Sequence, residues 1–231
     1  MIRVITIERE YGCGGGIIAS KIADTLGWKL WDQALTSEIA RLANCEPSEV
    51  EGREERVDPL YYRLLKSVMR GSFEGSLNLH RLHCLDADRV FRITKQITEQ
   101  AASAGNCVIV GRGSQHHLRD RSDTLRIFLF APRKDKIRRL VSEGIAESEA
   151  EQLIDTVDQE RADFVAKYFH IEWPNRSLYH AMLNTSSGQH AVIHAIVSLK
   201  EGLELESDQR SRLENNPRQA ATGNRVQGLR G

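Results

Sequence analysis

The 231-residue sequence has no long hydrophobic run, no net charge and no paired cysteines, and each absence excludes a class of protein. No apolar stretch approaches the roughly 20 residues that a membrane-spanning helix needs, and residues 1–10 are too charged for a secretory signal peptide. The 32 basic and 32 acidic residues balance, which argues against a large basic surface for nucleic acid. We therefore expect a cytoplasmic protein that binds neither membranes nor nucleic acid.

The four cysteines stand alone, with no CxxC pair among them. Isolated cysteines of this kind are typical of reduced thiols in a cytosolic protein and are not the framework of a disulfide-rich domain or a zinc site. The adjacent His116 and His117 point in different directions in most backbone conformations. We therefore predict no metal site built from these side chains.

Short apolar runs rich in β-branched residues alternate with amphipathic segments along most of the chain. Unbroken apolar runs such as NCVIVG are typical of strands that are covered on both faces of a parallel sheet. The alternation predicts an α/β fold, a three-layer parallel sheet of about five strands with helices on both faces. The expected strands lie at residues 2–7, 28–31, 106–111, 124–132 and 179–186. Functional residues are then expected in the loops at the carboxyl ends of these strands.

A glycine-rich turn lies between the first expected strand and the first expected helix. The stretch EREYGCGGGII has four glycines between Gly12 and Gly16, where backbone N–H groups can form a nest for phosphate at a helix N-terminus. The P-loop pattern G-x-x-x-x-G-K-[ST] fails, because Gly15 and Gly16 occupy the lysine and hydroxyl positions. The dinucleotide pattern G-x-G-x-x-G/A fails at Ile17. The turn alone is compatible with phosphate binding and with a purely structural role.

Five segments between residues 2 and 203 together resemble the cytidylate kinase-like proteins of the nucleoside monophosphate kinase group. They are REYGCGGGIIASKIADTLGW, GNCVIVGRGSQHHLRDR, IFLFAPRKDKIRRL, DQERADFVAKYF and YHAMLNTS. They are similar to that family's glycine loop (which also lacks the usual lysine), its third strand and substrate loop, its lid, and its last strand. The resemblance implies a P-loop nucleoside kinase-like fold with a helical lid. It also implies phosphoryl transfer from ATP to CMP or dCMP with Mg²⁺.

Two positions depart from the pattern of the family that the chain resembles. The family often has a basic residue where Gly16 stands, and a small hydroxyl residue where Cys13 stands. A thiol donates hydrogen bonds more weakly than a hydroxyl. Both differences bear on catalytic rate more than on nucleotide binding. The alternative to an active kinase is therefore a catalytically weakened nucleotide-binding or sensing module.

Without a loop lysine, arginines must supply the positive charge around the transferred phosphoryl group. Arg112 follows the third strand between two glycines, and a guanidinium there suits a phosphate or a pyrimidine edge. We assign Arg112 and Asp32, which ends the second strand, to the acceptor substrate. Asp32 as the N-cap of the next helix is an open alternative. The residues assigned to ATP are Arg9, Gly12, Cys13, Gly14, Gly15 and Gly16, with a surface salt bridge as the alternative role of Arg9.

The lid that the resemblance implies contains the remaining candidates. Asp158 and Arg161 are spaced i,i+3 on one helix face, so Arg161 would fold over the phosphates while Asp158 holds it in place. The alternative is an ordinary surface ion pair. One of Arg138 and Arg139 is expected to face the crevice, and we assign Arg138 to catalysis together with Arg161 and Asp158.

The sequence predicts one P-loop domain over residues 1–205, which contains a substrate-side helical insert at 46–84 and the lid at 133–170. Residues 206–231 have few apolar residues and no periodicity, which predicts a disordered tail. The expected partner is the nucleotide substrate, and the expected state is a monomer or a homodimer.

Overall fold

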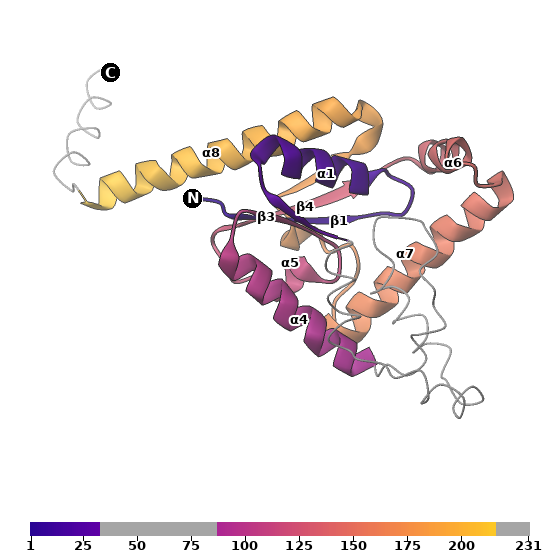
Figure 1. The fold of residues 1–231 in the computed structure, drawn as a ribbon, viewed down its shortest axis with the longest axis horizontal. Helices are drawn as coiled ribbons and strands as arrows, with labels where there is room; N and C mark the ends of the chain where they lie inside the picture. The colour runs from indigo at the N-terminus through magenta and orange to yellow at the C-terminus, as the bar shows by residue number, and fades with distance from the viewer. Residues whose placement is uncertain (33–86, 216–231) are drawn as a thin grey trace, which may run out of the picture.

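The computed structural model describes residues 1–32 and 87–215 (Figure 1). The helix expected at 33–44, the insert expected at 46–84 and the last part of the expected tail lie outside the described residues. In the described part of the chain, no helix has the length and apolar character needed to cross a membrane.

Five parallel strands form one sheet in the order β2-β3-β1-β4-β5. β1 is central, and its Ile7 is in register with Val110 of β3 and with Ile127 of β4. The parallel sheet and its strand positions confirm the prediction from the sequence. The strands are β1 (Val4–Arg9), β2 (Lys29–Trp31), β3 (Cys107–Val110), β4 (Thr124–Phe130) and β5 (Ala181–Asn184).

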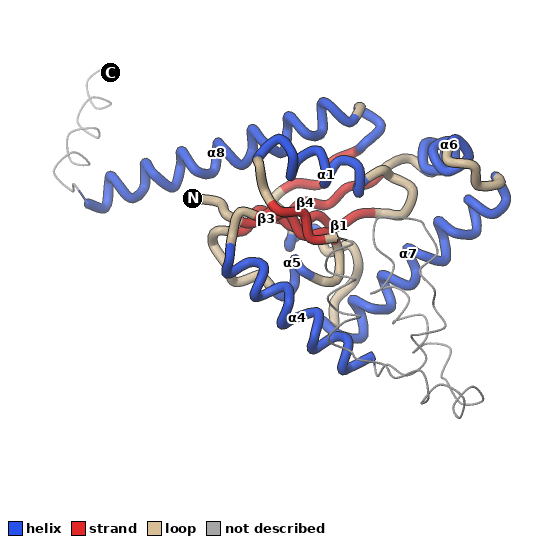
Figure 2. The backbone as a smooth tube through the Cα atoms, in the orientation of Figure 1, coloured by secondary structure: helices blue, strands red, loops and turns tan. Residues whose placement is uncertain are grey.

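Helices cover both faces of the sheet, as expected, with α1 and α8 on one face and α4 and α5 on the other (Figures 1 and 2). Ile5 and Ile7 of β1 pack toward α1 and α8, whereas Val4 belongs to the core under α4 and α5. Alternate side chains of a strand point to opposite faces, so one buried strand contributes to both cores. The helices are α1 (Gly15–Leu26), α4 (Ala87–Ala104), α5 (Ser114–His117), α6 (Arg133–Ser142), α7 (Glu147–Phe169) and α8 (Gln189–Asn215), with short 3₁₀ turns η3 (Arg176–Leu178) and η4 (Thr185–Ser187).

Helix α1 follows the glycine turn directly and ends where the sequence predicts. Gly27 caps it in the left-handed conformation, and its N–H bonds the carbonyls of Ala23 and Asp24, a common helix ending. Ile18 and Ile22 face the core, but Ile17 is 44% exposed. Ile17 lines a pocket because it lies one position off the core-facing side of the helix.

Helix α8 extends further than the expected domain boundary at residue 205. It continues to Asn215, so the first part of the segment expected to be a disordered tail is helical. Residues 206–215 contain neither glycine nor proline, the two residues that most disfavour a helix, and their glutamates and arginines have high helix propensity. In Figure 1 the C-terminal part of α8 runs past the edge of the sheet.

Helices α6 and α7 form the region expected to be a lid, beside the glycine turn (Figure 1). Leu140 of α6 packs with Ile154 and Val157 of α7 and with Tyr11 of the turn. The far end of α7 lies on α4, where the rings of Phe91 and Tyr168 stack with centroids 4.3 Å apart. The two helices therefore join the glycine turn to the opposite layer of the fold.

Candidate active site

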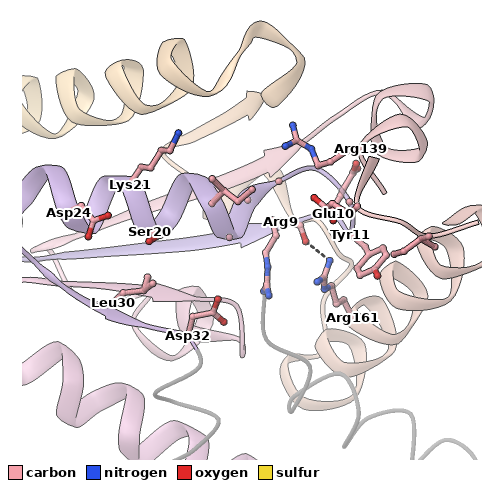
Figure 3. Close-up of a pocket in the computed structure, with 17 residues that line it drawn as sticks. Arg9, Glu10, Tyr11, Ser20, Lys21, Asp24, Leu30, Asp32, Arg139 and Arg161 are labelled. Carbon is pink, nitrogen blue, oxygen red and sulfur yellow. Dashed lines mark hydrogen bonds between the residues drawn. The ribbon is translucent and has the colours of Figure 1, made fainter. Parts of the chain in front are cut away.

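A pocket of about 720 Å³ opens at the carboxyl ends of the strands and is bordered by the glycine turn (Figure 3). Gly14, Gly15 and Gly16 form part of its wall, and Asp32 and Arg161 reach it from β2 and α7. Crevices at this edge of a parallel sheet are where ligands bind. The structure thus brings together, at one site, residues that lie more than 100 positions apart in the sequence.

The backbone of the glycine turn is arranged as the phosphate-nest interpretation requires. Gly12 and Gly14 have φ of 73° and 76°, values that side chains disfavour. Gly14 is the N-cap residue of α1, and it has no side chain to accept hydrogen bonds from the first turn. The N–H groups that begin α1 can therefore serve an anion at the positive end of the helix.

Three guanidinium groups lie close together beneath this turn. Arg9, Arg112 and Arg161 are only 5%, 5% and 9% exposed. Burial lowers the pKa of Arg9, and the nearby charge of Arg161 lowers it further. Burial also lowers the pKa of Arg112 to about 10, while the carboxylate of Asp32 opposes that change. Asp32 is itself 4% exposed, so these four residues form a buried charged cluster.

Arg9 is not the surface salt bridge that was its alternative role. A Cβ atom at Gly15 would lie 2.9 Å from Cβ of Arg9, and one at Gly111 would lie 2.1 Å from its Nη1. The Arg9 side chain therefore packs between the glycine turn and the loop after β3. It also forms a long ion pair with Glu8, with Nη1 3.9 Å from Oε1.

Arg112 lies in a turn of unusual backbone conformation directly after β3. Gly111, Arg112 and Gly113 have φ of 64°, 63° and 69°. The left-handed region costs an L-residue with a side chain about 1–2 kcal/mol, and such strain is concentrated at functional sites. Arg112 does not line the 720 Å³ pocket; it borders a cavity of about 20 Å³ together with Arg9 and Arg161. The strained backbone is therefore the observation that points to a functional role for it.

The pair predicted in the lid is fixed to the glycine turn, with Arg161 buried and Asp158 partly buried. The carboxylate of Asp158 accepts hydrogen bonds from Tyr11 N at 2.7 Å and from Arg161 Nη1 at 3.0 Å, and Lys136 Nζ lies 3.4 Å from it. Arg161 Nη1 also donates to the carbonyl of Arg9 at 2.8 Å (Figure 3). Burial raises the pKa of Asp158, and its cationic neighbours oppose that rise. We call these four residues, Tyr11, Lys136, Asp158 and Arg161, the Asp158 network.

Of the two neighbouring arginines on α6, the structure brings Arg139 to the pocket and leaves Arg138 outside it. The Arg138 side chain is 75% exposed and pairs with Asp135. The assignment of Arg138 to the crevice is therefore wrong in its geometry. The physical reason is the helix register, because Leu140 is buried against α7 and this fixes which side of α6 faces the turn.

The family comparison places the whole arrangement in context. The model of the cytidylate kinase-like family matches residues 4–187, which include the glycine turn, the loop after β3, both lid helices and β5. The chain belongs to the cytidylate kinase-like family. Membership, together with the α/β fold, supports a nucleotide or small-molecule kinase-like function and gives no support to the dinucleotide-binding pattern.

The chain aligns with several solved structures of other proteins. An uncharacterized protein from Eubacterium ventriosum aligns at a TM-score of 0.62 with 17% identity, covering 87% of this chain and 99% of that one. Shikimate kinase from Bacteroides thetaiotaomicron aligns at 0.47 with 14% identity, covering 88% and 99%. A gluconokinase from Sinorhizobium meliloti aligns at 0.48 with 13% identity, covering 89% and 97%. No curated protein matches the sequence.

Four residues of this cytidylate kinase-like site were not found by the sequence reasoning. Lys136 bridges Glu10 at 2.9 Å and Asp158, and Gln115 Nε2 donates to the buried carboxylate of Glu8 at 2.5 Å. Charged residues at the end of an otherwise apolar buried strand were a signal for Glu8 and Glu10. Nothing in the spacing of Lys136 or Gln115 indicates their partners, since Glu10 and Glu8 lie more than 100 residues away and Asp158 lies on the next helix.

His116 and His117 of α5 pack against the aromatic rings of Phe169 and Phe91. The ring of His116 stacks on Phe169 with centroids 4.3 Å apart. Burial and the nearby Arg119 lower the pKa of His116 to about 4, so the ring is neutral at pH 7. Within the described residues, no group of three or more potential metal-ligating side chains comes together.

Cys13 contributes its backbone, and not its thiol, to the turn. Its side chain is fully buried, with Sγ 3.7 Å from the carbonyl of Leu129, while its own carbonyl accepts a 2.8 Å hydrogen bond from Thr185 Oγ1. Asn184 and Ser186 make a local turn in which the Asn184 carboxamide accepts from Ser186 N at 3.0 Å. The loop after β5 thus supports the glycine turn from behind.

Cys13 is expected to resist alkylation in the folded protein. Burial raises its pKa to about 11, so at pH 8 only about 0.1% of the thiol is thiolate, the reactive form. We expect iodoacetamide to modify Cys13 at least about 100-fold more slowly in buffer than in guanidinium chloride, as followed by peptide mass spectrometry. Comparable rates in the two conditions would mean that the glycine turn opens readily.

Proposed function

We propose that this cytidylate kinase-like protein transfers a phosphoryl group from ATP to CMP, dCMP or a related small acceptor. The observation that carries the proposal is the position of the charged cluster directly beneath a glycine turn with an open helix N-terminus. Arg9, Asp32, Arg112 and Arg161 come from four different elements and are nevertheless buried side by side. Catalysis of phosphoryl transfer consists mainly of positioning and of charge stabilisation, which such a cluster can provide.

In this proposal the donor phosphates bind the N–H groups that begin α1. Arg112 and Asp32 bind the acceptor, with the Arg112 guanidinium on its phosphate. Arg161 approaches from the lid, residues 133–170, and its position depends on Asp158. The pocket, lined by both main-chain amides and charged side chains, has a size within the range of small-molecule sites.

The chemical step is an in-line displacement at the γ-phosphorus of ATP. An oxygen of the acceptor phosphate forms the new P–O bond. The bond from the γ-phosphorus to the β,γ-bridging oxygen breaks, and its electron pair leaves with ADP. The acceptor oxygen is already ionised at neutral pH, so no side-chain base is needed. The products with CMP are CDP and ADP.

Mg²⁺ fits the residues that are present. This ion is usually held by one or two carboxylates and by substrate phosphates, and Asp32 offers one carboxylate at the pocket. The ion would neutralise charge on the donor phosphates. Gly16 offers no hydroxyl for it, so the chain's contribution to holding Mg²⁺ would rest on Asp32.

The second candidate function is nucleotide binding without efficient catalysis. Gly15 and Gly16 stand where a P-loop kinase has its lysine and its hydroxyl, and this observation favours a sensing module. Such a protein would bind ATP through main-chain amides and would turn over slowly with every acceptor.

A two-part experiment tests the proposal and separates it from the alternative. We expect the full chain with ATP and Mg²⁺ to form ADP and CDP when CMP is added, measured by ion-exchange chromatography, and to form less product with AMP or UMP. Equilibrium dialysis with labelled ATP measures binding independently. Binding without transfer to any monophosphate supports the sensing module, and the absence of binding rejects both.

The proposal includes a cytoplasmic location and a nucleotide as the main partner. It is compatible with a monomer and with a homodimer, because the described cluster is contained within one chain. Light scattering of the purified protein, with and without ATP, decides between those two states.

A further inference from the structure

The glycine turn lacks the positive charge that a P-loop places on the transferred phosphate. Gly15 stands at the lysine position and Gly16 follows it. Main-chain amides can hold a polyphosphate, but they do not replace a cation where charge moves during transfer. A side chain from elsewhere in the fold must therefore supply the cation if the protein is a kinase.

Arg139 is a cationic side chain whose guanidinium group lies directly against this turn. A Cβ atom placed on Gly14 would be 2.6 Å from both Cζ and Nη1 of Arg139, so the guanidinium occupies the space that a side chain at Gly14 would fill. The absence of a side chain at Gly14 thus permits the close approach. Arg139 also lines the pocket, together with Gly14, Gly15 and Gly16.

The other cations near the turn are already engaged. Arg161 donates to the Arg9 carbonyl and to Asp158, and Lys136 bridges Glu10 and Asp158. For Arg139, by contrast, no hydrogen bond or ion pair joins the guanidinium to any residue among 1–32 and 87–215, and Glu143 lines the same pocket without pairing with it. Arg139 therefore keeps its donors for a ligand.

The position of Arg139 differs from that of the buried cluster. Figure 3 shows Arg139 and Asp32 on opposite sides of the ribbon that leads from Arg9 to α1. Arg9 and Arg161 lie on the same side as Asp32 in this view. If the buried cluster faces the acceptor, Arg139 faces the donor.

We infer that Arg139 of α6 supplies the charge of the missing P-loop lysine by binding the β- and γ-phosphates of the donor nucleotide. The inference rests on the proposed function and names a catalytic residue for it. As the bond between the γ-phosphorus and the bridging oxygen breaks, negative charge grows on the β-phosphate of the leaving ADP. A guanidinium held there stabilises the transition state more than the ground state.

The test compares charge-removing substitutions on one helix. We expect Arg139→Gln to lower kcat about 10–100-fold, the loss typical of one charge-assisted contact to a reacting group, with the KM for CMP within about two-fold. Lys134→Gln is the matched control, because Lys134 lies on α6, is exposed and does not line the pocket. We expect it to keep wild-type kcat. Arg139→Lys should recover part of the loss.

A double variant that places the cation at another position distinguishes loss of the charge from general damage to the fold. Gly16 lines the same pocket, so Gly16→Arg combined with Arg139→Gln returns a cation to the turn. We expect the double variant to regain at least about a third of the kcat lost. Recovery by a cation of different origin is not expected if Arg139 only supports the fold.

The outcomes separate this inference from the function on which it rests. If the wild type neither binds nor turns over ATP, the proposed function fails, and the inference fails with it. If the wild type is active and Arg139→Gln stays within two-fold of it, or if Arg138→Gln carries the loss instead, only the inference is wrong. If the wild type binds ATP without turnover, Arg139→Gln must weaken ATP binding at least about ten-fold in equilibrium dialysis, and unchanged binding overturns the inference.

Discussion

Replacement of Asp158 by alanine is expected to lower the free energy of unfolding by about 3 kcal/mol, the lower end of the range for breaking a buried ion pair. The carboxylate serves Tyr11 N, Arg161 and Lys136 at once. Its removal leaves two cations with one partner fewer in a site where water enters poorly. The lower end of the range applies because the Asp158 side chain is still 18% exposed to solvent. Chemical denaturation followed by circular dichroism measures the change.

Asp155→Ala is the matched control on the same helix. Asp155 pairs with Arg133 in solvent, with side chains 67% and 48% exposed, and exposed pairs contribute about 0–1 kcal/mol. We expect the control to unfold within about 1 kcal/mol of the wild type. Equal losses in the two variants would mean that the Asp158 network is as weakly coupled as a surface pair.

The same substitution has a consequence for the site. Asp158 orients Arg161, and Arg161 holds the carbonyl of Arg9, the residue that enters the glycine turn. Asp158→Asn keeps an acceptor for Tyr11 but loses the charge, so we expect it to fold with an intermediate loss of stability. Asp158 and Arg161 therefore act first as structural links between the lid helices and the turn.

The sequence was sufficient for the sheet because hydrophobic periodicity is local information. Apolar runs such as that of β3, and the glycine that ends α1, are each readable within a few residues. The burial of Ile17 was harder to predict, because successive residues of a helix are separated by about 100° around its axis. Ile18 therefore faces the core while Ile17 faces the pocket. The extension of α8 was missed for a different reason, since a solvated helix needs no apolar period.

The site was only partly predictable from the sequence. Glycine and arginine positions at strand ends follow from the rule that parallel strands present their carboxyl ends at one edge. The choice between Arg138 and Arg139 depended on the register of α6, which is set by its packing on α7. The contacts of Lys136 with Glu10 and Asp158 join three distant segments. The local spacing of residues in the sequence does not predict such contacts, because they form only when the helices and the sheet pack together.

Replacement of Arg112 by glycine is expected to remove function with little loss of stability. The residue is in the left-handed region with φ of 63°, and glycine relieves about 1–2 kcal/mol of backbone strain there. Burial also lowers the pKa of this guanidinium to about 10, which means that the fold disfavours its charged form. Relief of the backbone strain is expected to offset much of what the lost contacts of the guanidinium contribute, so the melting temperature should stay within a few degrees of that of the wild type.

The activity of the same variant should fall by about 10²–10³-fold in kcat/KM for the acceptor, the range observed when one preorganised charge-stabilising donor is removed. Calorimetry and steady-state assays with varied CMP give both quantities on one preparation. Arg121→Ala is the contrasting variant, because Arg121 holds Asp123 and the carbonyl of Ala102 and belongs neither to the buried charged cluster nor to the glycine turn. It should melt earlier with an unchanged KM for CMP. If Arg112→Gly instead melts several degrees lower and keeps its KM for CMP, Arg112 is a structural residue, and the acceptor must be bound elsewhere.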